Sequence, residues 1–201
     1  KNNLCEMILF FRKNLLLVLW SLATLLILFT GCKRKNGADK AKPIDIKIDR
    51  FEEDLFGISV YNLHDSIFFL KNKYPEFFPL FNNRVIEIGS SNEKGYANRL
   101  IAFVTDFTIY NAYKQTRQVF DDINNIEEEL GEVFGRFNYH FPEKTIPRVI
   151  TMISGFNQSI VTSDSLLAIS LDKYLGEDEE LYKLMYPPIP QYIRYVMHPQ
   201  K

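Results

Sequence analysis

Residues 148–176 read RVITMISGFNQSIVTSDSLLAISLDKYLG, and the strands within them determine how the chain folds. Three short apolar or β-branched runs occur here, Val149–Ile153, Ile160–Thr162 and Leu167–Leu171. Turn-type residues separate the runs at hairpin spacing. In the third run, large apolar residues alternate with small ones, as in a strand with one covered face. We therefore predict a small three-stranded antiparallel β-meander over about residues 147–172.

Helical periodicity dominates the sequence before this meander. Apolar residues recur at helical spacing and predict helices over residues 63–74, 96–110, 111–120 and 125–137, with a further short helix after Pro75. Ile44, Ile46 and Ile48 alternate with charged residues and predict a strand where the folded part begins. Two short helices are expected after the meander, over residues 178–185 and 191–197. The sequence thus predicts one α+β domain, residues 44–201, with several N-terminal helices packed on the meander.

Composition sets the broad class of protein. The chain has 201 residues, of which 46% are hydrophobic, and its 17 Phe and 11 Tyr favour an aromatic-rich core. The net charge of −1 argues against nucleic acid as a partner, because nucleic-acid binding needs a concentrated basic surface. The chain ends at Met197-His198-Pro199-Gln200-Lys201 with no helix-ending signal, so we expect the domain to be incomplete at its C-terminus.

The N-terminus has the features of a bacterial lipoprotein signal. Arg12 and Lys13 precede the apolar run Leu15–Phe29, which is shorter than the roughly 20 residues that span a bilayer. Gly31-Cys32 follows this run like the end of a lipobox. We expect cleavage before Cys32, attachment of fatty-acyl chains such as palmitate to it, and hence a signal peptide over residues 1–32. The alternatives are an uncleaved anchor helix and an incidental thiol.

A polar tether connects this lipid to the domain. Residues 33–43, KRKNGADKAKP, contain no large apolar side chain and predict a flexible linker. No acidic run follows Cys32, which favours a periplasm-facing position. The lipid would hold the protein on the cell membrane or the outer membrane.

A search for chemistry finds no catalytic motif. His64, His140 and His198 are isolated from one another in the sequence, and Cys5 is the only cysteine besides Cys32. We therefore predict no metal, no cofactor and no enzymatic activity. The polar candidates are Asn157, Gln158, Asp164 and Asp172, which could form an interaction surface on the turns of the meander. The structural alternative is that Asn157 and Asp164 only close those turns.

Several motifs resemble one known family. They are Gly31-Cys32, Ile48-Asp49-Arg50-Phe51, Tyr74-Pro75-Glu76-Phe77-Phe78, Ile153–Val161, Leu171–Gly176 and Met197-His198-Pro199. In this order they resemble the GldB-type gliding-motility lipoproteins of Bacteroidota. The resemblance implies a lipoprotein of the cell envelope with protein partners in the gliding or associated secretion machinery, and it brings no established catalytic residues. It extends distantly to zinc-peptidase-like domains, where a sheet precedes a metal-binding helix, but here only His198 stands in that place.

The leading interpretation is a membrane-anchored, non-enzymatic component of gliding motility or its secretion machinery. One alternative is a degenerate or metal-dependent periplasmic hydrolase that uses Asp172 or His198. Another is a general envelope-maintenance lipoprotein.

Overall fold

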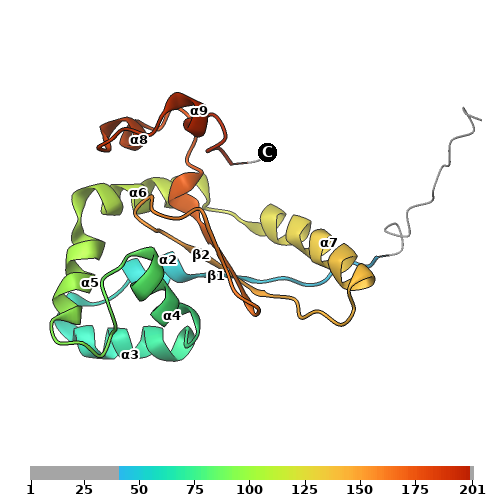
Figure 1. Cartoon of the computed structure of the whole chain (residues 1–201), viewed down its shortest axis with the longest axis horizontal. Helices are drawn as coiled ribbons and strands as arrows, with labels where there is room; N and C mark the ends of the chain where they lie inside the picture. The colour runs from blue at the N-terminus through green and yellow to red at the C-terminus, as the bar shows by residue number, and fades with distance from the viewer. Residues whose placement is uncertain (1–40, 200–201) are drawn as a thin grey trace, which may run out of the picture. The chain divides into compact units, whose positions relative to one another are not determined.

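The computed structural model describes residues 41–199, so the predicted signal peptide and most of the predicted tether lie outside the described residues. The helices and strands follow one another along the chain as shown in Figure 1. In order they are β1 (Ile48–Arg50), α2 (Phe51–Phe56), η2 (Val60–Asn62), α3 (Leu63–Lys73), α4 (Phe77–Leu80), η3 (Phe81–Val85), α5 (Tyr96–Thr105), α6 (Phe107–Val119), α7 (Asn124–His140), β2 (Arg148–Met152), β3 (Ile160–Thr162), β4 (Leu166–Ser170), η4 (Leu171–Lys173), α8 (Glu180–Leu184) and α9 (Gln191–Arg194).

The strands form one mixed sheet in the order β1-β2-β4-β3. β2 runs parallel to both β1 and β4, and β3 runs antiparallel to β4 at the edge. The predicted α+β class is confirmed. The predicted antiparallel meander is wrong, because β4 lies between β2 and β3 and pairs with β2 in parallel.

The connection after β2 explains this difference. The Asp172 carboxylate, just beyond β4, accepts hydrogen bonds from the backbone N–H groups of Ser154 and Phe156 at 3.2 and 2.7 Å. These bonds hold the chain across the end of β4, so that it continues to the far side of β4 rather than turning back beside β2. Gly155 and Phe156, both at positive φ, make the bend. β2 is thereby a central strand, which agrees with the burial of Val149–Met152 on both faces.

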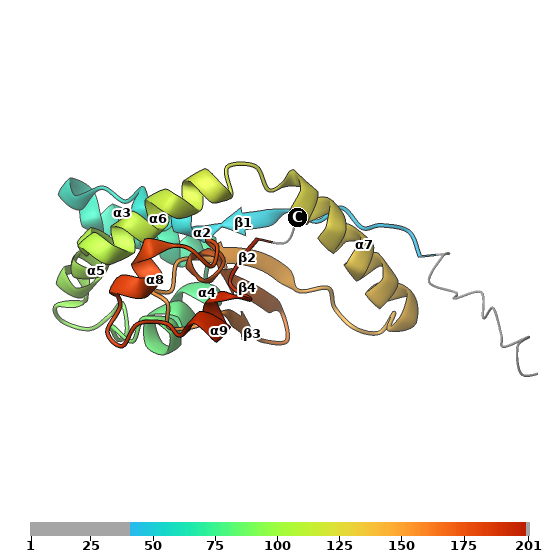
Figure 2. The ribbon, with the colours of Figure 1, turned by 90° about the horizontal axis from the view of Figure 1, so that it is seen from above.

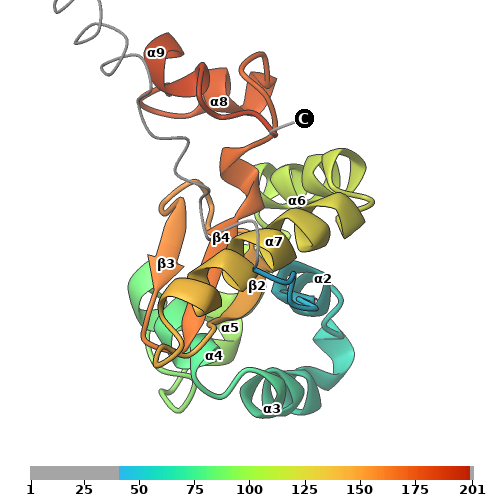
Figure 3. The ribbon, with the colours of Figure 1, turned by 90° about the vertical axis from the view of Figure 1, so that its right-hand side faces the viewer.

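One face of the sheet is covered by the helices that precede α6, which lie behind the sheet in Figure 3. Phe51 of α2 is fully buried there and makes edge-to-face contacts with Tyr74 and Phe77 at 5.0 Å between ring centroids. Ile150, Met152 and other residues of β2 and β4 complete this cluster. The core is therefore aromatic-rich, as the composition predicted.

α7 covers part of the opposite face and lies in front of the strands in Figure 3. Phe134 of α7 packs with Ile46 and Val149. Residues 44–47 precede β1 and run beside α7, where the Ile44 N–H donates to the Gly131 carbonyl at 3.0 Å. The strand predicted from Ile44 thus begins only at Ile48, because α7 rather than another strand accompanies the earlier residues.

Several helix boundaries differ from the prediction. α7 ends at His140 rather than at residue 137, and α9 ends at Arg194 rather than at residue 197. The break predicted near Tyr110 lies at Asp106, whose carboxylate caps α6 by accepting from the N–H groups of Thr108 and Ile109 at 2.9 and 3.0 Å. α7 begins at Asn124, one residue earlier than predicted. The Asp122 side chain accepts the Asn124 N–H at 2.8 Å.

Residues 174–199, here called the C-terminal segment, form a further layer beside α6, as seen from above in Figure 2. Tyr182 is fully buried, contacts Phe156 edge to face at 5.7 Å, and donates its hydroxyl to the Asp172 carbonyl at 2.8 Å. Within the segment, the Gly176 N–H donates to the Met197 carbonyl at 2.9 Å, while the two contacts of Tyr182 reach outside it. The segment is thus attached to the loop that ends the sheet.

Candidate functional site

The three parallel strands all end at the same edge of the sheet, and each is followed by a buried polar residue. Glu52 follows β1, Ser154 follows β2 and Asp172 follows β4, and each has no exposed surface. This edge is where sheets with parallel strands commonly place ligand-binding groups.

Asp172 is held by its own neighbouring backbone. Besides the two N–H donors described above, the Ser154 hydroxyl lies 3.4 Å from one carboxylate oxygen and 3.5 Å from the other. Burial raises the pKa of Asp172 to about 6, against the lowering effect of the backbone hydrogen bonds. The sequence had suggested Asp172 as part of an interaction surface. The structure corrects this, because Asp172 lies beneath the surface and fixes the loop between β2 and β3.

A second buried acid was not singled out from the sequence. Glu52, at the start of α2, accepts a hydrogen bond from Arg50 Nε, and Arg50 Nη1 donates to the Phe120 carbonyl at 2.9 Å. Burial raises the pKa of Glu52, while Arg50 and Thr151 lower it. Within the described residues, Glu52 Oε2 and Arg50 Nη2 have no hydrogen-bond partner. A buried carboxylate that is only partly satisfied costs stability.

A cavity of about 710 Å³, here called the α7 cavity, opens next to Thr151 on the face of the sheet that α7 partly covers. Its walls come from the first half of α7, from β1, β2 and β4, and from the end of the C-terminal segment. The apolar lining includes Ile48, Ile126, Ile169, Leu171 and Val196, and the polar lining includes Glu128, Glu129, Glu132, Thr151, Tyr195 and His198.

The charge of this cavity is negative on the α7 side. Glu127, next to the cavity, is paired with Lys47 at 2.8 Å, which lowers the pKa of Glu127. Glu132 is paired with Arg136 at 3.0 Å. Glu128 and Glu129 form no ion pair with any of residues 41–199. The cavity therefore combines an apolar floor with two uncompensated carboxylates.

His198 lines the same cavity as these glutamates. In the part of the chain that the structure describes, no group of three or more His, Cys, Asp or Glu residues is arranged to hold a metal ion. Nor does any helix between residues 41 and 199 have the length and apolar character needed to cross a membrane.

The remaining predicted surface residues are exposed but do not converge. Asn157 and Gln158 lie on the loop after β2, where the Asn157 side-chain amide donates to the Val85 carbonyl at 3.1 Å. Asp164 lies in the turn between β3 and β4. Because β3 and β4 pair antiparallel with Ile160 opposite Ile169, that turn is at the other end of β4 from Asn157. Asn157, Gln158 and Asp164 therefore do not form one continuous surface.

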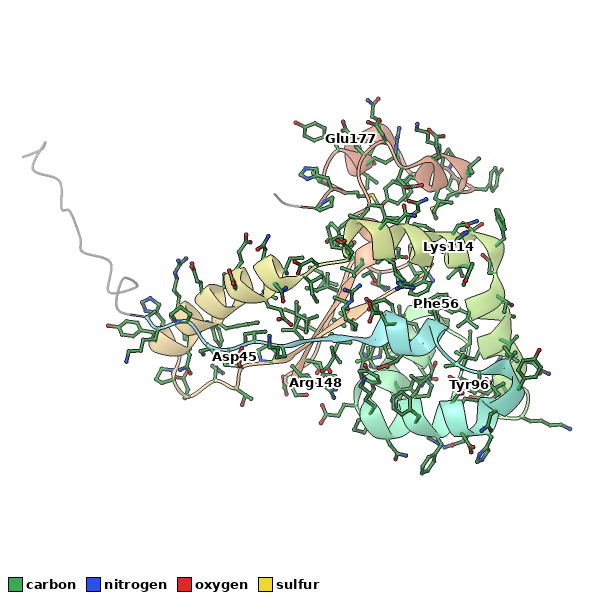
Figure 4. All side chains as sticks on the ribbon, turned by 180° about the vertical axis from the view of Figure 1, so that it is seen from behind. Asp45, Phe56, Tyr96, Lys114, Arg148 and Glu177 are labelled. Atoms are coloured by element: carbon green, nitrogen blue, oxygen red, sulfur yellow. The ribbon has the colours of Figure 1, made fainter. Side chains whose placement is uncertain are left out.

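The C-terminal segment exposes large apolar and aromatic side chains that the sequence search overlooked. Five of them, each at least 65% exposed, lie within residues 184–196 and are here called the C-terminal patch: Leu184, Tyr186, Tyr192, Tyr195 and Val196. Figure 4 shows side chains projecting from this segment near Glu177. In the sequence, the C-terminal patch could have been recognised only from its closely spaced tyrosines, which do not follow helical periodicity.

Fold and site together define a small α+β protein with a mixed sheet, buried acids at the strand ends and an acidic, apolar cavity beside them. Residues 32–201 match the family model described as gliding motility protein GldB, so the chain belongs to this family of lipoproteins. No curated protein and no solved structure matches the chain. Membership connects the protein with gliding motility and with membrane association.

Proposed function

We propose that this protein is a lipid-anchored, non-enzymatic component of the gliding-motility apparatus or of the secretion machinery associated with it. Lipid on Cys32 would hold it on the cell membrane or the outer membrane, facing the periplasm. The folded domain would then act by contacting other proteins of the apparatus. Family membership supports the link to gliding motility, and the surface of the domain supports the mode of action.

The C-terminal patch is the observation that carries this proposal. Tyrosine is enriched at protein interfaces, because its ring gives a large contact area and its hydroxyl tolerates water when the partner is absent. Three exposed tyrosines, Tyr186, Tyr192 and Tyr195, lie within ten residues of sequence in a segment that is itself fastened to the sheet. Exposed apolar side chains concentrated in this way typically mark a contact site.

The buried acids support a non-enzymatic role more than a hydrolytic one. Asp172 is the acid that the hydrolase alternative would use, but it is fully buried and its oxygens accept hydrogen bonds from Ser154 and Phe156. A carboxylate engaged in this way holds the loop and has no open path to a substrate. The exposed turn residues Asn157, Gln158 and Asp164 would contribute separate, smaller contacts.

The test is complementation of a strain that lacks the gene. A triple variant, Tyr186→Ser, Tyr192→Ser and Tyr195→Ser, should accumulate normally but fail to restore colony spreading, because the anchor and the core are untouched. The matched control is Tyr61→Ser, since Tyr61 is 99% exposed on η2, outside the C-terminal segment, and should support spreading. Immunoblots would check that all variants accumulate equally.

Two outcomes would contradict the proposal. Normal spreading by the triple variant would show that the C-terminal patch makes no essential contact. A growth defect in a strain that lacks the gene, under conditions without gliding, would favour the envelope-maintenance alternative instead.

A further inference from the structure

The register of the sheet shows which part of its α7-side face is left uncovered. Directly paired residues share a face, so Arg50, Thr151, Ile169 and Ile160 form one row across β1, β2, β4 and β3. Along this row burial decreases toward β3. Thr151 is buried, Ile169 is half-buried, and Ile160 is 53% exposed. α7 therefore covers the β1 and β2 part of the face, Leu167 and Ile169 of β4 pack against its edge, and β3 is left open.

The α7 cavity borders this open strip. Ile169 lines it from the sheet and Leu171 from η4. Ile126 lines it from α7, and Tyr195 and Val196 line it from the C-terminal segment. An apolar strip of a sheet beside a packed helix is normally covered by a second helix, because each layer buries its apolar face against the next. The volume of about 710 Å³ is large enough to receive several apolar side chains.

Charge decides what kind of helix would fit. Glu128 and Glu129 lie on the cavity side of α7 without a cation from residues 41–199, and Glu132 adds a third carboxylate. A cationic side chain that enters the cavity from a partner would meet these carboxylates where water is partly excluded, which strengthens the attraction. Glu128 and Glu129 are exposed, so an acidic occupant would be repelled by them and an uncharged one would gain no ion pair.

We propose that the α7 cavity is the docking site for an amphipathic helical segment of a partner protein. Its apolar face would lie on Ile126, Ile169 and Val196, and its Lys or Arg side chains would lie beside Glu128 and Glu129. This inference rests on the proposed function as a partner-binding protein, and it gives that partner a chemistry. The basic residues 33–43 of this chain have the matching charge but no large apolar side chain, so they could pair with the glutamates but could not cover the apolar lining.

The probe is a fluorescent Leu/Lys amphipathic peptide of about 18 residues, long enough to be helical when bound. Binding to the full chain in neutral phosphatidylcholine nanodiscs would be followed by fluorescence anisotropy, with empty nanodiscs as the blank. The double variant Glu128→Lys and Glu129→Lys should bind it about tenfold more weakly, since two attractions become repulsions. The same variant should bind a Leu/Glu peptide more tightly than the unaltered chain does.

The control variant changes the charge by the same amount elsewhere. Glu143 and Glu177 are exposed and lie outside the α7 cavity, so Glu143→Lys with Glu177→Lys should leave peptide binding unchanged. Val196→Asp should weaken binding through the apolar lining, without a change at α7, because Val196 lines the cavity and is 65% exposed.

Several results would overturn the inference. Equal losses in the two double variants would show general attraction of charge, and equal binding of a Ser/Lys peptide would show that the apolar floor plays no part. A concentration-dependent dimer that Glu128→Lys dissociates would assign the cavity to a second copy. Protection of Ile160 and Ile169 from hydrogen exchange that is lost when residues 33–40 are deleted would assign it to the tether.

Failure here is distinguishable from failure of the proposed function. Tyr186 and Tyr192 lie outside the lining of the α7 cavity, so a variant with only Tyr186→Ser and Tyr192→Ser separates the two proposals. If the Glu128→Lys and Glu129→Lys variant spreads normally while this double tyrosine variant does not spread, the docking site is contradicted and the proposed function is not. Normal spreading by both variants would contradict the docking site and the proposed function alike.

Discussion

At the scale of single residues, Asp172 shows how much of the site the sequence could reveal. Its position after an alternating strand correctly drew attention to it, but the sequence could not show that the chain after β2 crosses over it. Asp172 is buried beneath that loop, which it holds by hydrogen bonds, and burial raises the pKa of Asp172 to about 6. Glu52 was missed for a similar reason, because the acidic run Glu52-Glu53-Asp54 reads as a solvated helix start while its first member is fully buried.

The raised pKa of Asp172 predicts a pH dependence of stability. Between about pH 4 and pH 6 the folded protein holds a proton on Asp172 that the unfolded chain releases, so the free energy of unfolding falls as the pH rises through this window. From about pH 5 to about pH 7.5, Asp172 should account for a loss of about 1 kcal/mol. Glu52, whose pKa is also raised, acts in the same direction.

Urea denaturation followed by far-UV circular dichroism would measure this effect. Asp172→Asn cannot ionise, so its stability should change less over the same pH interval than that of the unaltered protein, even though the variant is weaker overall. A pH dependence identical in both proteins would show that Asp172 keeps an ordinary pKa.

At the scale of elements, the helices were easier to predict than the strand pairing. The α7 stripe, including Ile126, Leu130 and Phe134, is a local pattern, and a helix appears where it was expected. The pairing of β2 with β4 depends on a crossover that the spacing of apolar runs does not encode. The uninterrupted burial of Val149–Met152 is what distinguishes a central parallel strand from a half-exposed one.

α7 also carries a feature that its sequence only hinted at, a pair of glycines four residues apart. A Cβ on Gly131 would overlap the Ile44 carbonyl oxygen, and a Cβ on Gly135 would overlap the Lys42 carbonyl oxygen. The missing side chains let residues 42–44 lie directly on the helix, where the Ile44 N–H bonds to the Gly131 carbonyl.

Alanine at these two positions should therefore destabilise the protein. Gly→Ala inside a helix normally stabilises by up to about 1 kcal/mol, so the overlap must exceed this gain, and we expect a net loss of roughly 1–3 kcal/mol. Asn138→Ala, at an exposed position of the same helix, is the matched control and should be neutral or slightly stabilising. Thermal unfolding of the single variants would give the comparison, and a more stable Gly135→Ala protein would show that residues 42–44 do not lie on α7.

At the scale of the whole molecule, the resemblance to the family came from motifs spread along the chain, and the family match over residues 32–201 confirms it. The α+β class was equally readable. The α7 cavity and the C-terminal patch were not, because both arise where segments distant in sequence meet, such as the ends of β4 and of the C-terminal segment. In Figure 4, Asp45 is labelled beside α7, and Glu177 is labelled in the C-terminal segment.

The proposed anchoring predicts how the protein is distributed in cells. Cys32→Ser removes the sulfur that would carry the lipid, so the protein should move from the membrane fraction to the soluble fraction, or remain unprocessed with its signal peptide attached. Mass spectrometry of the N-terminal peptide and fractionation after cell lysis would measure both. A variant that stays in the membrane at the mature size would contradict lipid attachment at Cys32.

The path by which the chain enters the domain has a mechanical consequence. Residues 42–47 run along α7 and lead straight into β1, which pairs in parallel with β2 (Figure 1). A pull on residue 41 along this path would load the β1–β2 hydrogen bonds in shear, so that several must break at once. The same pull across the sheet would unzip them one at a time at a much lower force. In the lipid-anchored, partner-bound state proposed above, this entry route would set how much force the fold can withstand.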